Sequence, residues 1–277
     1  MNARLRAAAL APAAALMIAT VAVPFVVLAA YAFQTRGAYG GVMPPWTAEN
    51  WLRLADPLYA GILARSFLAA AVSTAFCLLM AFPLALAISR AGRWKNLLLA
   101  LVMVPFWTSL LIRTYAWMFL LRDTGLVNSL LMKAGVISEP LPLLYNWGAV
   151  VLGLVYAHLP FMVLPLYAAL ERQEPHLLEA AADLGARDWQ AFWRVTLPLA
   201  APGIRAGVLL VFIPCVGTYL IPDLLGGGKT ILAGTLIQNQ FTAARDWPFG
   251  AAVSLALMAV VLALLWIEAR RREEPLL

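Results

Sequence analysis

Six long stretches of this 277-residue chain are almost free of charge, and they constrain the fold more than any other feature. A helix crosses the hydrocarbon core of a bilayer in roughly 17–25 residues, and it satisfies its own backbone hydrogen bonds there. No alternating strand pattern accompanies the stretches, and Arg113 alone interrupts one of them. The sequence therefore predicts an all-α membrane protein with six transmembrane helices, within 7–35, 66–89, 96–121, 140–170, 206–222 and 247–267.

Composition and charge agree with a membrane environment. The chain is 63% apolar and 12% charged, whereas a soluble domain has roughly 45–50% and about 25%. Its net charge of +6 does not indicate a nucleic-acid partner, because the basic residues flank the apolar runs. The clusters at 90–95 and 270–272 fall on one side of the bilayer, which by the positive-inside tendency is the cytoplasmic side. We therefore expect both termini to be cytoplasmic and the chain to contact membrane lipid.

Three features of the sequence could indicate a secretory signal, a cysteine site or a nucleotide-binding loop, but each is better explained otherwise. The run 7–35 resembles a secretory signal, but a signal's apolar core is roughly 7–15 residues long, so an uncleaved first span is favoured. Cys77 and Cys215 lie inside apolar runs, where packing is favoured over a disulfide or a metal site. Gly228-Lys229-Thr230 ends like a nucleotide-binding loop, but Asp223 occupies the position of its first glycine. We therefore expect no catalytic residue, metal or cofactor site in this chain.

The segment 171–205 is the conspicuously polar inner loop. Pro175 suits the first turn of a helix, and Gly185 suits its end in the left-handed conformation, which predicts a helix from about His176 to Leu184. Asp188 is the expected cap of a second short helix that contains Trp189, Phe192 and Trp193, before Pro198 and Pro202 bracket the entry to span five. Spacing alone leaves two readings open: docking in a groove of another protein, or an amphipathic hairpin on the lipid surface.

The same loop resembles the EAA loop of ABC importer permeases, through Glu179-Ala180-Ala181, Gly185 and the later Leu197-Pro198. The resemblance implies the type I ABC importer fold and a coupling helix seated on a separate cytoplasmic P-loop ATPase, present in two copies, that binds the ATP and Mg. The resemblance also predicts the division of the chain: a first helix with an outer segment over 1–60, a transmembrane domain of five helices over 61–267, and a cytoplasmic tail over 268–277. The implied coupling residues are Glu179, Ala180, Ala181, Asp183, Leu184 and Gly185.

Longer stretches are similar to permeases of spermidine/putrescine importers. These are PFWTSLLIRTYAWM (105–118), VYAHLPFMVLPLYAAL (155–170), IPDLLGGGKT (221–230) and RDWPFGAA (245–252). The resemblance implies polyamine transport, a second permease subunit and a periplasmic substrate-binding protein. Related branches carry iron(III), thiosulfate or amino-acid-like solutes. Outside the family, a secondary transporter would need an internal repeat and paired intramembrane carboxylates, and a membrane-embedded enzyme would need clustered His, Asp or Glu. Neither pattern is evident.

A polyamine site would combine carboxylates with aromatic faces, because ion pairing and cation–π attraction both favour a flexible polycation. Packing or lipid contact is the competing interpretation of each aromatic residue. Arg113 is a poor ligand for a cation and suits a structural or gating role, and His158 suits a packed hydrogen-bonding group. The candidate residues of the translocation path are Asp223, Tyr219, Tyr156, Trp107, Tyr115 and Trp117.

Overall fold

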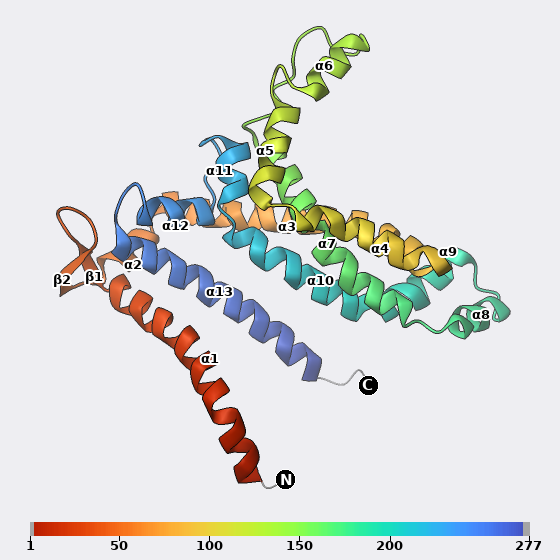
Figure 1. Cartoon of the computed structure of the whole chain (residues 1–277), viewed down its shortest axis with the longest axis horizontal. Coiled ribbons are helices and arrows are strands. Elements are labelled where there is room, and N and C mark those ends of the chain that lie inside the picture. The colour runs from red at the N-terminus through yellow and green to blue at the C-terminus, as the bar shows by residue number, and fades with distance from the viewer. Residues whose placement is uncertain (1–2, 274–277) are drawn as a thin grey trace. The chain divides into compact units, whose positions relative to one another are not determined.

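The computed structural model describes residues 3–273, which are mostly helical (Figure 1). Within this range five helices are long and apolar enough to cross a bilayer, and a bent pair supplies a sixth span. The prediction of an all-α protein with six spans is therefore confirmed, apart from one small sheet. The five helices are α1 (Ala3–Ala32), α3 (Pro57–Ser89), α7 (Trp147–Glu171), α10 (Leu197–Gly217) and α13 (Trp247–Glu273).

The third span differs from the continuous helix predicted over 96–121. A 3-10 turn, η1 (Gly92–Trp94), leads into α4 (Lys95–Met103), which ends in a second 3-10 turn, η2 (Val104–Trp107), before α5 (Leu110–Leu121). The two halves meet at an angle of 88°. Pro105 lacks the amide that would continue the hydrogen-bond ladder, and Thr108 is extended at φ −89°, ψ 152°. Apolar character continues through this break, so hydropathy did not reveal it.

Spans four and five also have different limits from those predicted over 140–170 and 206–222. The fourth helix begins only at Trp147, because Asn146 caps it by accepting a hydrogen bond from the Ala149 amide at 2.9 Å. The fifth begins at Leu197 and ends at Gly217. The chain then forms the separate short helix α11 (Leu220–Gly226). The outer segment after span three contains the short helix α6 (Leu126–Lys133), followed by Gly135.

The chain forms two compact units. One unit combines the residues up to Ile62 with those from Leu236 onward, and the other spans Leu63–Thr235. In the first unit α1 packs along α13 (Figure 1). The same unit contains an unpredicted antiparallel pair, β1 (Gln34–Arg36) and β2 (Val42–Trp46), then α2 (Glu49–Leu54). The last short helix is α12 (Ala233–Phe241).

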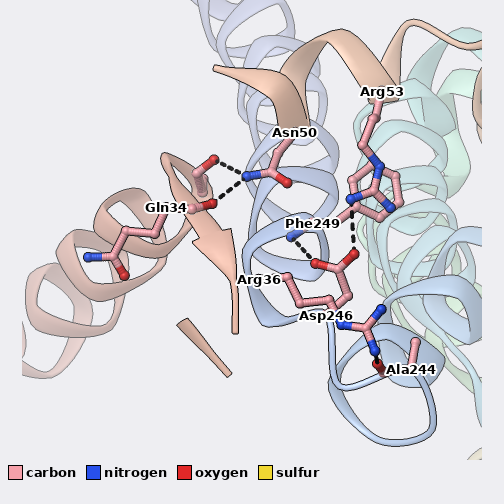
Figure 2. Close-up of polar contacts among 8 residues, drawn as sticks. Gln34, Arg36, Asn50, Arg53, Ala244, Asp246 and Phe249 are labelled. Atoms are coloured by element: carbon pink, nitrogen blue, oxygen red, sulfur yellow. Dashed lines mark hydrogen bonds and ion pairs between the residues drawn. The ribbon is translucent and has the colours of Figure 1, made fainter. Parts of the chain in front are cut away.

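A polar clamp formed by Asn50, Arg53 and Asp246 fastens the first unit (Figure 2). Asn50 is buried and donates from Nδ2 to the carbonyl oxygens of Ala32 at 3.0 Å and Gln34 at 2.8 Å. These carbonyls belong to the end of α1 and to the strand that follows it. Because a buried carbonyl without a partner is costly, the amide of Asn50 stabilises the exit from the first helix.

The charged half of the clamp fixes the start of α13 (Figure 2). Arg53 Nη1 lies 2.9 Å from Asp246 Oδ2, and its guanidinium lies 4.2 Å from the centre of the Phe249 ring. The other oxygen of Asp246 accepts the Phe249 amide at 3.2 Å, as a capping side chain does at a helix start. Burial lowers the pKa of Arg53, but the hydrogen bond and negative charge of Asp246 outweigh it, so the net pKa is raised. The residue therefore remains a cation.

Helices α7 and α10 form the main packing interface of the second unit (Figure 1). A Cβ at Gly203 would lie 2.6 Å from the Pro165 carbonyl oxygen and 2.6 Å from the Ala169 Cβ. A Cβ at Gly207 would lie 2.5 Å from the Met162 sulfur. The two glycines, four residues apart, therefore let the two helix backbones approach closely, as small residues do between membrane helices.

Candidate functional site

The loop between α7 and α10 contains the predicted helix as α8 (Pro175–Asp183). Glu174 precedes it in extended conformation, and proline occupies its first turn, where the missing amide removes no helical hydrogen bond. Glu174 Oε2 also lies 2.9 Å from His176 Nε2. The helix predicted from about His176 to Leu184 is therefore confirmed, with each end one residue earlier.

The end of α8 forms a complete left-handed cap at Gly185, whose φ is +79°. The Gly185 amide donates to the Ala182 carbonyl at 2.8 Å, and the Ala186 amide donates to the Ala181 carbonyl at 3.0 Å. This pair of bonds defines the Schellman motif, which satisfies carbonyls that the helix itself leaves free. The predicted role of Gly185 as a helix stop is confirmed.

Most of the predicted coupling residues, on α8 and at its C-terminal end, are exposed. Ala181 is half-buried, while the others are exposed, and Leu184 is 89% exposed. The opposite side of α8 borders a pocket through Leu178 and Ala182, which it shares with Arg90 at the end of α3. One side of the helix thus contacts its own unit, whereas the other is available to a partner. The exposed coupling residues are Glu179, Ala180, Asp183, Leu184 and Gly185.

The segment after α8 differs from the predicted separate helix. A helical turn, α9 (Asp188–Ala191), runs through a π-helical turn, η3 (Phe192–Thr196), directly into α10. Asp188 was predicted as the cap, but the capping position is Arg187, whose amide donates to Gln190 Oε1 at 2.8 Å. Pro198 lies at the start of α10, where proline is tolerated, so it does not interrupt the helix. The second half of the loop is therefore an extension of span five.

Both ends of the loop are fastened to neighbouring helices. Gln173 Nε2 donates to the Thr196 carbonyl at 3.0 Å, which joins the two flanks of α8. Lys95 at the start of α4 pairs with Glu171 at the end of α7. Phe192 packs edge-on against Phe82 of α3, with ring centres 5.5 Å apart. A displacement of α8 would consequently be transmitted to the helices of its unit.

Among the predicted path residues, the structure brings together Trp117 and Tyr156. Their rings lie 5.5 Å apart at 75°, an edge-to-face contact between α5 and α7. Asp223 lies on α11 and Tyr219 is the N-cap residue of that helix, so neither lies at the end of the fifth helix, and the Asp223 amide donates to the Tyr219 carbonyl at 3.0 Å. Both of these side chains are exposed.

Trp107 and Tyr115 show no ring contact with the other path residues within the described part of the chain. Trp107 is 78% exposed at the bend of the third span, and Tyr115 is 44% exposed on α5. Arg113, on the same helix, has buried Nε and Nη1 atoms without hydrogen-bond partners in this structure. Its role was predicted as structural or gating, and it remains a prediction.

The buried centre of the second unit contains His158. Its Nδ1 lies 2.9 Å from the Leu154 carbonyl and 3.5 Å from Cys215 Sγ. Cys77 Sγ donates to the Val155 carbonyl at 3.6 Å, and both cysteines are free and buried. These contacts agree with packed hydrogen-bonding roles. The residues described contain no group of three His, Cys, Asp or Glu side chains that could hold a metal ion.

Sequence reasoning missed three buried polar residues with structural roles, the first of which is Asn50 of the polar clamp. Asn128 of α6 is fully buried and bonds the backbone on both sides of it, and Asp246 anchors the polar clamp. A single polar residue in a loop carries no local signal of burial. Asp246 pairs with a residue 193 positions away, which a pattern within one segment does not reveal.

Comparisons with known proteins agree with this architecture. The model of the family described as binding-protein-dependent transport system inner membrane component matches residues 58–270. The spermidine/putrescine transport system permease protein PotB of Haemophilus influenzae is 42% identical over 252 residues, covering 91% of this chain and 88% of that protein. PotB of Escherichia coli is 41% identical over 258 residues, covering 92% and 94%.

Solved structures show the same fold at lower identity. A chain of a bacterial ABC transporter involved in the import of the acidic polysaccharide alginate has a TM-score of 0.76 at 19% identity, covering 97% of this chain and 96% of that one. A chain of a second bacterial alginate ABC transporter structure, in complex with an alginate pentasaccharide-bound periplasmic protein, has a TM-score of 0.77 at 19% identity. The match covers 95% of this chain and 92% of that one. Because the family model covers most of the chain and the relatives exceed 40% identity, this chain belongs to the family of binding-protein-dependent transport system inner membrane components, the permeases of ABC importers.

Proposed function

We propose that this chain is a permease subunit of an ATP-driven importer of polyamines, putrescine and spermidine. The observation that carries the substrate assignment is the identity of 41–42% along about nine-tenths of the chain to relatives named as spermidine/putrescine permeases. A more distant relative, 31% identical, is named as a molybdenum transport permease, so the family as a whole does not specify the solute.

The proposed coupling element is α8, which docks in a groove of a cytoplasmic P-loop ATPase. Its exposed side, with Glu179, Asp183 and Leu184, supports this role, as do the fastenings at both ends of its loop. ATP and Mg bind the ATPase pair, whose closure shifts the spans between inward-facing and outward-facing states. The binding protein releases its solute into the opened cavity, and hydrolysis resets the assembly. The alternative of an amphipathic hairpin on lipid predicts no ATPase contact at these residues.

The proposed translocation path uses aromatic faces and one carboxylate. Trp117 and Tyr156 form an edge-to-face aromatic pair across α5 and α7, and Tyr219 caps the short helix α11 that contains Asp223. Each cation–π contact contributes roughly 0.5–2 kcal/mol, which suits weak, successive binding of a polycation during passage. Trp107 and Tyr115 are proposed as exposed members of this path.

The proposed assembly lies in the bacterial inner membrane with both termini of this chain in the cytoplasm. It contains a second permease, two ATPase copies and, during delivery, a periplasmic binding protein. The cytoplasmic tail follows the sixth span over 268–277, and the first helix with its outer segment occupies 1–60. The basic clusters at 90–95 and 270–272 support this orientation.

The substrate proposal is tested by uptake into proteoliposomes that contain the complete importer and enclosed ATP. With the loaded binding protein outside, labelled putrescine or spermidine should accumulate, and excess unlabelled polyamine should compete. Iron(III), thiosulfate and molybdate serve as competitors of other chemistry. Uptake of one of these, with no polyamine uptake, would overturn the substrate assignment but not the family.

The coupling proposal is tested with Glu179→Arg. This variant should lose co-purification with the ATPase and lose uptake, because a reversed charge would stand at the centre of the proposed interface. Glu139→Arg is the control, since Glu139 is also exposed but lies outside the 171–205 loop. Intact association and uptake in Glu179→Arg would refute the coupling role.

A further inference from the structure

The Leu63–Thr235 unit contains a further pocket, separate from the one beside α8, that neither the coupling role nor the translocation path uses. It has a volume of about 440 Å³ and is bordered by Arg122, Asp123, Pro142, Tyr145 and Lys229, among others. These residues come from three segments: the end of α5, the approach to α7, and the turn after α11. We call it the basic pocket, because two of its side chains are cations and one is an anion.

Asn128 holds two walls of the basic pocket in place. Its Nδ2 donates to the Arg122 carbonyl at 3.2 Å and to the Leu141 carbonyl at 2.9 Å, and its Oδ1 accepts the Leu141 amide at 3.0 Å. Because Asn128 is fully buried, these bonds have no competition from water. The backbone beneath Arg122 is thereby fixed relative to the segment that leads to Pro142.

Further contacts fix the approach to α7 and join it to the turn after α11. Asn146 Nδ2 donates to the Pro142 carbonyl at 2.7 Å while its oxygen caps α7. Tyr145 adopts a φ of +59°, which is uncommon for a non-glycine residue, and a Cβ at Gly227 would fall on its ring. Backbone strain of about 1–3 kcal/mol persists only where the surroundings determine it. The pocket is consequently a formed structure rather than a gap between loops.

The charges of the pocket are available to a ligand. Arg122 and Lys229 are both exposed, and within the described residues no carboxylate lies at ion-pair distance from either one. The Arg122 guanidinium lies 5.7 Å from the centre of the Phe119 ring, which positions it at the end of α5. An anionic group, a carboxylate above all, is what such a pair of cations binds.

The pocket lies at the opposite end of α7 from the coupling helix. Tyr145 immediately precedes the Asn146 cap, and α7 then runs for 25 residues to Glu171. At 1.5 Å per residue this separates the two ends by about 37 Å, which exceeds the roughly 30 Å hydrocarbon core, so the two ends lie on opposite sides of it. If α8 meets the cytoplasmic ATPase, the basic pocket faces the side from which the binding protein delivers its solute.

We propose that the basic pocket is a docking socket for an acidic side chain of the substrate-binding protein. The inference rests on the proposed function for the existence and side of that partner. Arg122 and Lys229 outnumber the single carboxylate of Asp123, so the net charge of the pocket disfavours the polyamine cargo. A lipid phosphate is the competing occupant of the same charge, and the assay in micelles distinguishes it from a protein carboxylate. Electrostatic complementarity of this kind orients a partner and raises its rate of association.

The experiment measures the Kd of the polyamine-loaded binding protein of the same importer for the complete complex in phospholipid nanodiscs. Lys229→Glu should weaken binding about tenfold, and adding Arg122→Glu should weaken it further, since reversed charges repel the partner's carboxylate. Lys133→Glu is the matched control, because it makes the same charge change at an exposed site outside the pocket, and its Kd should change less than about twofold. Lys229→Arg keeps the charge and should bind as the wild type does.

The outcomes separate the two proposals. If the wild-type complex does not bind the loaded protein, the proposed function fails. If the wild type binds, and Lys229→Glu binds equally well or no more weakly than Lys133→Glu, only the socket is refuted. The assay is repeated in maltoside micelles, which contain no phosphate. A Lys229→Glu effect that appears in nanodiscs and vanishes in micelles would identify lipid phosphate as the occupant and overturn the socket. Unchanged co-purification with the ATPase verifies that each variant is folded.

Discussion

Replacing Gly185 with alanine tests the link between the end of α8 and coupling. Gly185 has a φ of +79°, where an L-residue costs about 1–2 kcal/mol relative to glycine. A Cβ built there has no heavy atom within 4 Å, so the substitution adds no steric clash in this chain. The whole cost is therefore conformational. An energy of 1–2 kcal/mol corresponds to a factor of about 5–30 in the population of the capped conformation.

The same chain offers a matched control at Gly135, which ends α6. Its φ is +70°, a Cβ there also has no heavy atom within 4 Å, and its amide donates to the Met132 carbonyl at 3.0 Å. The Val136 amide donates to the Leu131 carbonyl at 3.0 Å, which completes the same Schellman pair. Gly135→Ala thus imposes the same strain on a helix outside the proposed ATPase interface.

The assay measures ATPase binding by titration and polyamine uptake for both variants. Gly185→Ala should weaken ATPase binding by up to about 5–30-fold, while Gly135→Ala should leave it unchanged. Gly185→Asn should fall between wild type and Gly185→Ala, because asparagine tolerates the left-handed conformation better than alanine does. Wild-type binding and uptake in Gly185→Ala would refute the reasoning. An equal loss in Gly135→Ala would show that the effect is general destabilisation.

Three further substitutions test the packing and the buried polar groups, each by thermal unfolding in detergent. Gly203→Ala should destabilise the protein by about 1–3 kcal/mol, because the new Cβ would meet the backbone of α7, whereas Gly61→Ala meets nothing within 4 Å and should not. Asp246→Ala should cost about 1–3 kcal/mol by removing the cap of α13 and the partner of Arg53, with the partial exposure of Arg53 limiting the loss. Asn128→Ala should cost about 1–3 kcal/mol, because it leaves buried backbone groups unpaired. An unchanged melting temperature in any one of them would contradict its assigned contact.

The features that the sequence predicted correctly, the limits of α8 and the number of spans, depend on residues within one segment of the chain. The limits of α8 depend on Pro175 and Gly185, whose backbone preferences act at their own positions. Span number follows from the length and apolar character of each run, which the bilayer thickness dictates. The close approach of α7 and α10 also has a local basis, because the four-residue spacing of Gly203 and Gly207 puts both on one helix face.

Other features depend on geometry that no single segment encodes. The third span turns by 88° near Thr108, although apolar residues continue on both sides of the break. The strands Gln34–Arg36 and Val42–Trp46 are too short, and too rich in proline, to show a period of two. The contact of Trp117 with Tyr156 joins two helices whose rotation is set by packing. Tyr219 and Asp223 were placed at the end of span five because hydropathy does not register that the helix stops at Gly217.

The prolines of α7 and the glycines of α10 define how this pair can move. Pro160 and Pro165 remove two amide donors from α7, which lowers the cost of bending it there. Gly203 brings the α10 backbone against the Pro165 carbonyl, at the same level. A bend in α7 at this level that left α10 straight would break the close packing, so the two helices must bend or tilt together. Since both helices lead into the loop that contains α8, we expect the pair to carry the displacement of the coupling helix as one body.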